Sequence, residues 1–259
     1  MRALLNSLKF RSPRVGDTVE AEVPQLRDAE LAAVYYGQRI GGDLCDFLRV
    51  SPQRVLFGLL DVAGRVEENH EIVSAAKAMF RSAGAEYLAQ EDINETDAMI
   101  EISLQLNRTI LKAADGVRSC PAFAGCYNEE LGTVCYFNAG HTAGLAMGSS
   151  GVTELHATGL PLGLFSHSPS DAGVVALEPG AVLLLVSRGV VEGKHKSEEF
   201  GLGRVKEGFE QRRSESAKEI CLSMLDDVKQ FSGNARMRND LTALALVRTN
   251  KASGTSLKL

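Results

Sequence analysis

Hydrophobic and polar residues follow two different periods along the chain. Short apolar runs that are rich in β-branched and aromatic residues, and are bounded by Gly, Pro, Asn or Ser, are typical of β-strands. Such runs predict strands at residues 19–25, 31–39, 46–50, 54–60, 122–128, 133–138, 143–147, 152–155, 173–177, 181–186 and 241–247. The run from 55 to 60 is almost continuously apolar, so we expect that strand to be buried on both faces.

Other segments repeat apolar residues at intervals of three and four, which predicts helices with one buried face. Two such helices are expected within residues 72–83 and 99–110. A third helix is predicted from Ser216 to about Phe231, because Ser216 is a good N-cap residue and Glu219 occupies the capping-box position. Strands, two helices, further strands, a helix and a closing strand together predict an α+β fold, with helices packed outside mainly antiparallel sheets.

Composition narrows the class of protein. The chain has 259 residues, of which 44% are hydrophobic and 24% charged, and its formal net charge is −5. These values are typical of a globular domain with a sizeable core, and no basic patch of the kind that binds nucleic acid is visible. We predict one domain at 24–248, an N-terminal tail and first extended segment at 1–23, and a disordered tail at 249–259. The mildly basic residues 1–14 are typical of a solvated tail, or of contact with a membrane or an acidic partner.

No segment has the pattern of a signal peptide or a membrane span. The longest apolar run, 181–186, is far below the roughly 20 residues that a transmembrane helix needs. The five cysteines include no pair at Cys-x-x-Cys spacing, which argues against a zinc site. Cys126 and Cys135 face each other across a predicted hairpin, either as free thiols or as a disulfide. We therefore expect a cytoplasmic protein without a membrane span.

Two aspartates lie where a carboxylate needs a compensating partner. Asp43 follows Gly41 and Gly42, which permit the sharp turn that presents a side chain at the end of a sheet. Asp61 comes directly after the buried strand, where an ionised carboxyl group is costly unless a cation or hydrogen-bond donors face it. Taken alone, each aspartate is also consistent with a simpler role in capping a loop or supporting a turn.

Downstream segments extend these two aspartates into a longer pattern. They are Asn138-Ala139-Gly140-His141, Gly159-Leu160-Pro161-Leu162-Gly163, Ser187-Arg188-Gly189-Val190-Val191-Glu192 and Asn239-Asp240-Leu241-Thr242. With Gly41-Gly42-Asp43 and Asp61-Val62-Ala63-Gly64, the set resembles in order the motifs of the SpoIIE/RsbU branch of the metal-dependent (PPM) serine/threonine phosphatases. The resemblance covers roughly residues 24 to 248. It implies an α-β-β-α sandwich with two Mg²⁺ or Mn²⁺ ions, and substrates that are phosphoserine or phosphothreonine proteins, often anti-sigma factor antagonists.

The resemblance also assigns the ions' ligands, and this sequence departs from it at two of them. By position, Asp61 bridges both ions, while Asp43 and the backbone carbonyl of Val62 hold one of them. The other ion requires aspartates at positions 188 and 239, where this chain has Arg188 and Asn239. An amide oxygen can still ligate a hard cation, and the neighbouring Asp240 could substitute after a small shift. Arg188 cannot ligate a metal ion, because guanidinium has no acceptor and stays charged.

Three functions remain open on these residues. The first is an active phosphatase that keeps one Mn²⁺ or Mg²⁺ ion, with Arg188 on the surface. The second is a pseudophosphatase that binds a regulatory protein without any ion, with Arg188 placed between Asp43 and Asp61 where a metal would lie. The third is a regulatory subunit that pairs with an active paralogue.

Two further features bear on the same site. His141 could act as a general base in an acidic pocket, although a structural role in its turn is the simpler interpretation. The loop after Asp61 reads Gly64-Arg65-Val66-Glu67-Glu68-Asn69-His70, where the branch has Gly-Lys-Gly followed by small residues. Small residues there pack the start of the helix close to the site, so their replacement indicates altered constraints.

Overall fold

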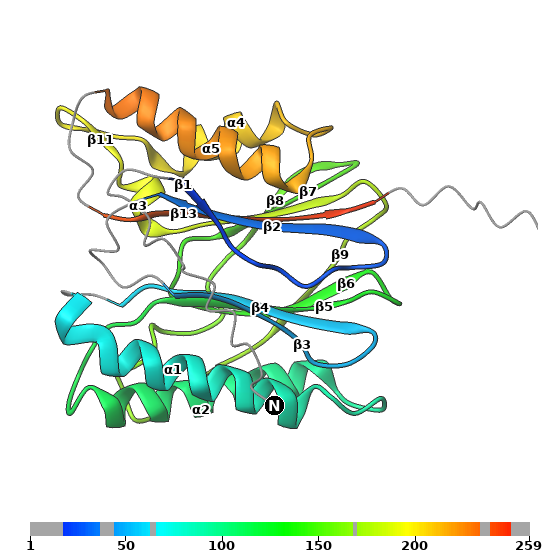
Figure 1. The fold of residues 1–259 in the computed structure, drawn as a ribbon, viewed down its shortest axis with the longest axis vertical. Coiled ribbons are helices and arrows are strands. Elements are labelled where there is room, and N and C mark those ends of the chain that lie inside the picture. The colour runs from blue at the N-terminus through cyan, green and yellow to red at the C-terminus, as the bar shows by residue number, and fades with distance from the viewer. Residues whose placement is uncertain (1–17, 37–43, 63–65, 168–169, 234–238, 250–259) are drawn as a thin grey trace, which may run out of the picture.

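Four layers stack in the order helices, sheet, sheet, helices (Figure 1). The computed structural model describes residues 18–36, 44–62, 66–167, 170–233 and 239–249. In this part of the chain the two large sheets pair only antiparallel strands, as the apolar periodicity predicted. The α+β sandwich that we expected is therefore confirmed.

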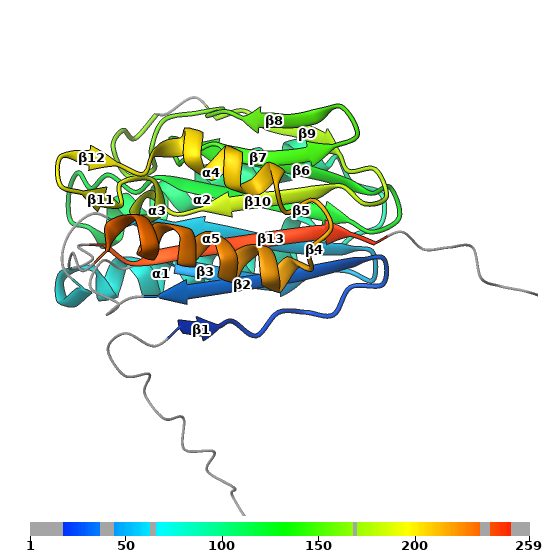
Figure 2. The same ribbon diagram turned by 90° about the horizontal axis from the view of Figure 1, so that it is seen from above.

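The first sheet has six strands and the second has five. In spatial order the first contains β1 (Thr18–Glu20), β2 (Ala29–Tyr36), β13 (Leu241–Arg248), β10 (Val182–Val186), β7 (Gly144–Gly148) and β8 (Gly151–Leu155). The second contains β3 (Leu44–Arg49), β4 (Arg54–Leu60), β5 (Ala122–Asn128), β6 (Thr133–Ala139) and β9 (Gly173–Ala176). The two edge strands of the first sheet are β1, from the N-terminal part of the chain, and β8, from its middle (Figure 2).

Helices cover the outer face of each sheet. The helices α1 (Val66–Tyr87) and α2 (Glu95–Ala113) pack on the five-stranded sheet, whereas α4 (Gly201–Glu210) and α5 (Ala217–Ser232) pack on the six-stranded one (Figures 1 and 2). The predicted capping box of α5 is confirmed, because Ser216 and Glu219 satisfy each other's backbone amides. This capping box stabilises the start of α5, while the apolar face of the helix fixes its position on the sheet.

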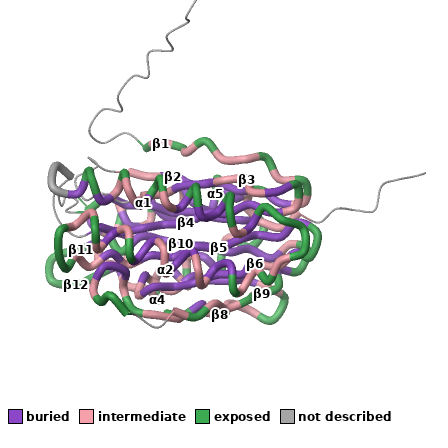
Figure 3. The backbone as a smooth tube through the Cα atoms, turned by 90° about the horizontal axis from the view of Figure 1, so that it is seen from below, coloured by how far each residue is buried: buried purple, intermediate pink, exposed green. Residues whose placement is uncertain are grey.

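Three apolar clusters hold the layers together, one between the sheets and one beneath each helix pair. Every residue of β4 is buried, because one face of this strand meets the inter-sheet core and the other meets α1 and α2. The central strands are buried along most of their length, and the hairpin tips are exposed (Figure 3). The buried strand 54–60 predicted from its apolar run is therefore confirmed.

The structure departs from the sequence prediction in several places. The strand expected at 19–25 forms only over Thr18–Glu20, and the helix α3 (Arg188–Val191), the small hairpin β11 (Lys194–His195) with β12 (Glu198–Glu199), and α4 were not predicted. All five cysteines are free thiols, and Cys126 pairs with Cys135 across β5 and β6 without a disulfide. Of the predicted tails, 1–17 and 250–259 lie outside the described residues. None of the described helices combines the length and apolarity required to cross a membrane.

Candidate functional site

Asp61 lies where β4 leaves the core. Its side chain is 11% exposed, and its backbone amide donates to the carbonyl of Pro121 at 2.9 Å. This backbone bond continues the pairing of β4 with β5 and fixes the direction of the strand's end. Burial raises the pKa of the Asp61 carboxyl group, while the charge of Arg188 acts to lower it. This geometry gives the buried carboxylate a cationic partner, which is one of the two kinds of compensation expected from the sequence.

Arg188 reaches Asp61 from the opposite sheet. It is the first residue of α3, directly after β10, and its Nε lies 3.2 Å from Oδ2 of Asp61. Its side chain is 47% exposed, so the ion pair is partly solvated. The contact joins the end of β4 in one sheet to the end of β10 in the other. Arg188 is therefore in contact with Asp61, as the second of the three sequence hypotheses requires of this pair.

The backbone around Arg188 is held by the start of β13. Ser187 donates its amide to the carbonyl of Thr242 at 2.9 Å, and its Oγ accepts from the amide of Thr242 at 3.0 Å. Gly189 lies against the carbonyl of Asp240, where a Cβ would come within 2.0 Å of the oxygen. Only glycine fits this approach, so the turn that carries Arg188 has one fixed position relative to residues 240–242.

Glu192 links the two positions where the resemblance implies aspartates. Its Oε1 lies 3.7 Å from Nε of Arg188, and its Oε2 accepts from Nδ2 of Asn239 at 3.2 Å. The amide nitrogen of Asn239, an exposed residue, thus turns toward a carboxylate. Sequence reasoning did not assign Glu192 a role, because its position four residues after Arg188 favours an ion pair only where the segment is helical, and α3 was not predicted. Positions 61, 188, 192 and 239 therefore form one chain of contacts.

Asp43 and Asp240 complete the set of predicted acidic residues. Asp43, with Gly41 and Gly42, lies outside the described residues, and so do residues 63–65. Asp240 is buried, and its backbone carbonyl accepts a hydrogen bond from Ser187 Oγ at 3.4 Å. Its role as a substitute ligand, like that of Asp43, stays a prediction.

The carbonyl of Val62 has a partner that sequence reasoning missed. Val62 follows Asp61 and is buried, and its oxygen accepts a hydrogen bond from Nδ2 of Asn69 at 3.0 Å. Asn69 lies in the first turn of α1 and is completely buried. The replacement of small residues after Asp61 was the available signal, but the sequence alone did not show what the larger side chain would contact.

His141 lies in a buried turn, close enough to Arg188 for its charge to act on the imidazole. Its backbone amide donates to Oδ1 of Asn138 at 2.8 Å, and Nδ1 lies 3.2 Å from the carbonyl of Thr142. Since a carbonyl only accepts, Nδ1 carries the proton and Nε2 is the bare acceptor. Burial, together with the charge of Arg188, lowers the pKa of His141 to about 4, although the bond to Thr142 acts in the opposite direction. The imidazole is therefore neutral at physiological pH.

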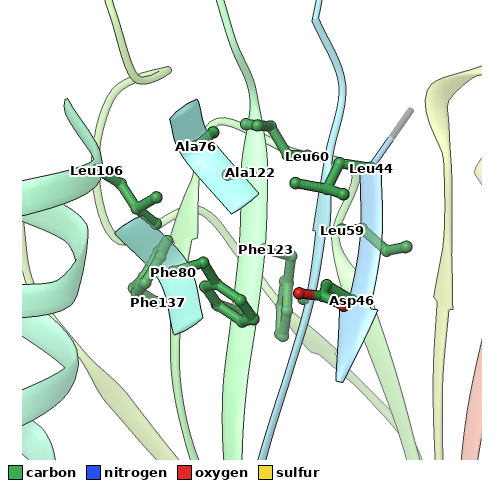
Figure 4. A pocket seen from close by; sticks show the side chains of 12 residues that line it. Leu44, Asp46, Leu59, Leu60, Ala76, Phe80, Leu106, Ala122, Phe123 and Phe137 are labelled. Atoms are coloured by element: carbon green, nitrogen blue, oxygen red, sulfur yellow. The ribbon is translucent and has the colours of Figure 1, made fainter. Parts of the chain in front are cut away.

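A separate pocket lies between the five-stranded sheet and the helices α1 and α2 (Figure 4). It encloses about 310 Å³, part of it open to solvent, and apolar side chains such as Phe80 and Phe137 line most of it. Its one acidic residue, Asp46, already accepts two hydrogen bonds of 2.7 Å from Arg81. Neither Asp61 nor Arg188 lines this pocket, so it offers no chemistry to the site.

Comparison with known proteins shows which family the sequence matches. The family model for stage II sporulation protein E (SpoIIE) matches residues 51–249. Among curated proteins, no sequence match was found.

Several solved structures share the fold at low sequence identity. The RsbU and RsbW domains of Rv1364c from Mycobacterium tuberculosis align with 88% of this chain at 21% identity, with a TM-score of 0.72. The SiaA-PP2C domain of Pseudomonas aeruginosa aligns with 85% of this chain and 86% of its own length, at 17% identity and a TM-score of 0.71. The PP2C phosphatase domain of SpoIIE from Bacillus subtilis, with a fragment of its regulatory domain, aligns with 86% at 15% identity and a TM-score of 0.64. This chain spans 64% of the first and third of these structures.

These likenesses establish the PP2C phosphatase fold that the motifs implied. The family model covers well over half of the sequence, including the strand β4 that Asp61 follows and the turn that carries Arg188. The chain therefore belongs to the SpoIIE family.

Proposed function

We propose that this chain is a regulatory, protein-binding member of the SpoIIE family in which a protein cation takes the place of a metal ion, so that two-metal hydrolysis of phosphoproteins is weakened or lost. The observation that carries the proposal is the 3.2 Å contact between Nε of Arg188 and Oδ2 of Asp61. Asp61 is the residue that the resemblance assigns to both ions, and one of its oxygens is engaged by a guanidinium group.

The donor set near Asp61 does not fit two divalent ions. Guanidinium has no acceptor atom and repels a cation, and the amide nitrogen of Asn239 points at Glu192. In the part of the chain that the structure describes, no three His, Cys, Asp or Glu side chains cluster in a way that could hold a metal ion. At most one Mn²⁺ or Mg²⁺ ion remains conceivable, on Asp61, Asp43 and the carbonyl of Val62.

The partner we propose is a regulatory protein of the kind that SpoIIE/RsbU-type phosphatases recognise, such as an anti-sigma factor antagonist, met in the cytoplasm. The fold likeness to RsbU and RsbW domains supports this class. A complex that needs no ion should survive chelation, so we expect the purified partner to remain bound in EDTA. Dissociation by EDTA, with rebinding on addition of Mn²⁺, would count against the proposal.

A second candidate function is a phosphatase that works with a single remaining ion. The exposure of Arg188 favours it, because a side chain that is 47% exposed can leave Asp61 without losing a buried contact. Both candidate functions leave Asp61 at the end of β4.

Hydrolysis of a phosphoserine peptide separates the two candidates. The wild type and Asp61→Asn are assayed side by side with Mn²⁺ and with Mg²⁺, because Asp61→Asn removes the charge that any ion in this site requires. We expect any turnover to be weak and equal in the two proteins, because the wild type has no metal-activated hydrolysis for Asp61→Asn to remove. Turnover by the wild type that Asp61→Asn abolishes would overturn the proposal in favour of the one-ion phosphatase.

A further inference from the structure

A second oxygen at the end of β4, the backbone carbonyl of Val62, also faces a hydrogen-bond donor of this chain. Nδ2 of Asn69 lies 3.0 Å from this oxygen, and both residues are almost completely buried. The carbonyl belongs to the residue after Asp61, so it lies on the same strand end as the Arg188 contact. Two neighbouring acceptors, one carboxylate and one carbonyl, thus each face a donor of the protein.

The amide group of Asn69 opposes the binding of a cation to this carbonyl oxygen. An N–H group places positive charge against the oxygen, as a bound cation would, and a cation on the same oxygen has to approach beside that charge. A fully buried side chain cannot turn away into solvent. Breaking the bond would leave a buried donor and a buried acceptor to be satisfied elsewhere.

We propose that Asn69 is a positioning residue that closes the remaining ion position at the carbonyl of Val62, as Arg188 closes the other at Asp61. This inference rests on the proposed function and adds a residue that acts through the backbone carbonyl of Val62. It gives a role to a large polar side chain that is buried in a segment where the resemblance implies small residues.

A purely structural role for Asn69 makes a different prediction. If the bond serves only to fix the start of α1 on β4, its removal lowers stability without changing affinity for a divalent ion. The two roles are therefore separated by measuring Mn²⁺ binding rather than stability alone.

The test uses calorimetry with Mn²⁺ on the full chain in the background Arg188→Asp/Asn239→Asp, which restores two acidic ligands. We expect this double variant to bind about one ion per chain, and the addition of Asn69→Ala to admit a second ion or to tighten binding about tenfold. Asn69→Leu, which keeps roughly the volume of the side chain and removes the donor without adding a charge, should tighten binding as much. It decides the question if the alanine variant fails to fold.

The matched control is Asn128→Ala in the same background. Asn128 is also a buried asparagine, but it donates to Glu95 at 2.7 Å, at the other end of β4. It should leave Mn²⁺ binding unchanged. If neither Asn69 variant changes affinity or stoichiometry, or if both weaken binding, the inference about Asn69 is wrong. A double variant that gains an ion independently of Asn69 would still leave the role of Arg188 standing.

Discussion

The two ends of β4 each carry an arginine–carboxylate pair, and the two pairs are built differently. At its start, Arg54 lies 2.6 Å from Glu95, and both side chains are largely buried. Arg54 also donates to two backbone carbonyls, and Glu95 accepts a further bond from Asn128. At its end, Arg188 approaches Asp61 through Nε at 3.2 Å and keeps 47% of its side chain exposed.

This difference separates a structural ion pair from a compensating one. The first pair joins β4 to the connection between α1 and α2 through several donors, which is the arrangement that makes a buried ion pair stable. The second pair leaves Asp61 with a raised pKa, because a partly solvated guanidinium offsets only part of the cost of burial. This is the state that we expect of Asp61 if, as we propose, the guanidinium of Arg188 takes the place of a divalent ion.

The largest expected effect comes from breaking the structural pair. Arg54→Ala should lower the free energy of unfolding by about 3–5 kcal/mol, because it leaves Glu95 charged, buried and without its main partner. Urea denaturation of both proteins at pH 7 measures the difference. A loss below that of an ordinary surface substitution would show that the first pair is no stronger than the second.

A smaller effect is expected from acid at the site end. The pKa of His141 is lowered to about 4 by burial, so its stabilising neutral form is complete above the unfolded pKa of about 6.5. Stability is then lost as the pH falls from 6.5 toward 4, by up to about 3 kcal/mol. His141→Gln should remove this part of the pH dependence in denaturation curves between pH 7 and 4. His156→Gln, at an exposed histidine, is the control and should leave it in place.

Asp61 acts in the opposite direction. Its folded pKa is raised, so the stability it contributes is present below its usual pKa and is lost as the pH rises through the raised value. Comparison of His141→Gln with Asp61→Asn thus separates the two groups by the sign of the change.

The smallest effect is expected from removing the compensating cation. Arg188→Ala should change the free energy of unfolding by about 1 kcal/mol or less at pH 7. Solvent screens the charge of a half-exposed arginine, so its ion pair contributes little to stability. It should also raise the pKa of Asp61 further, which NMR titration of the carboxyl group can follow. An effect as large as that of Arg54→Ala would contradict the distinction between the two pairs.

Much of this architecture is predictable from the order of apolar residues. The continuous run 55–60 indicated a strand buried on both faces, and the position of Asp61 after it indicated a carboxylate in need of a cation or hydrogen-bond donors. Residues 194–210 were missed, because α4 buries only Val205 and Phe209 and the hairpin before it is exposed. Two apolar positions are too few to establish a helical period.

Within the site, the sequence could predict only a contact made by a charged residue that does not fit the motif around it. Arg188 could be identified as the partner of Asp61 because its type conflicts with the motif around it. Asn69 could not be placed in the same way, because its bond to the carbonyl of Val62 depends on how closely α1 approaches β4. Such contacts are set by packing between layers, which the sequence does not encode in any local pattern.

The central claim is that the guanidinium of Arg188 takes the place of a divalent ion. Calorimetric titration with Mn²⁺ of the wild type, Arg188→Asp and the control Arg204→Asp tests it most directly, since Arg204 is a comparably exposed arginine paired with Glu198. We predict no ion bound by the wild type or the control, and a bound ion in Arg188→Asp. Equal Mn²⁺ binding by all three proteins would contradict the claim.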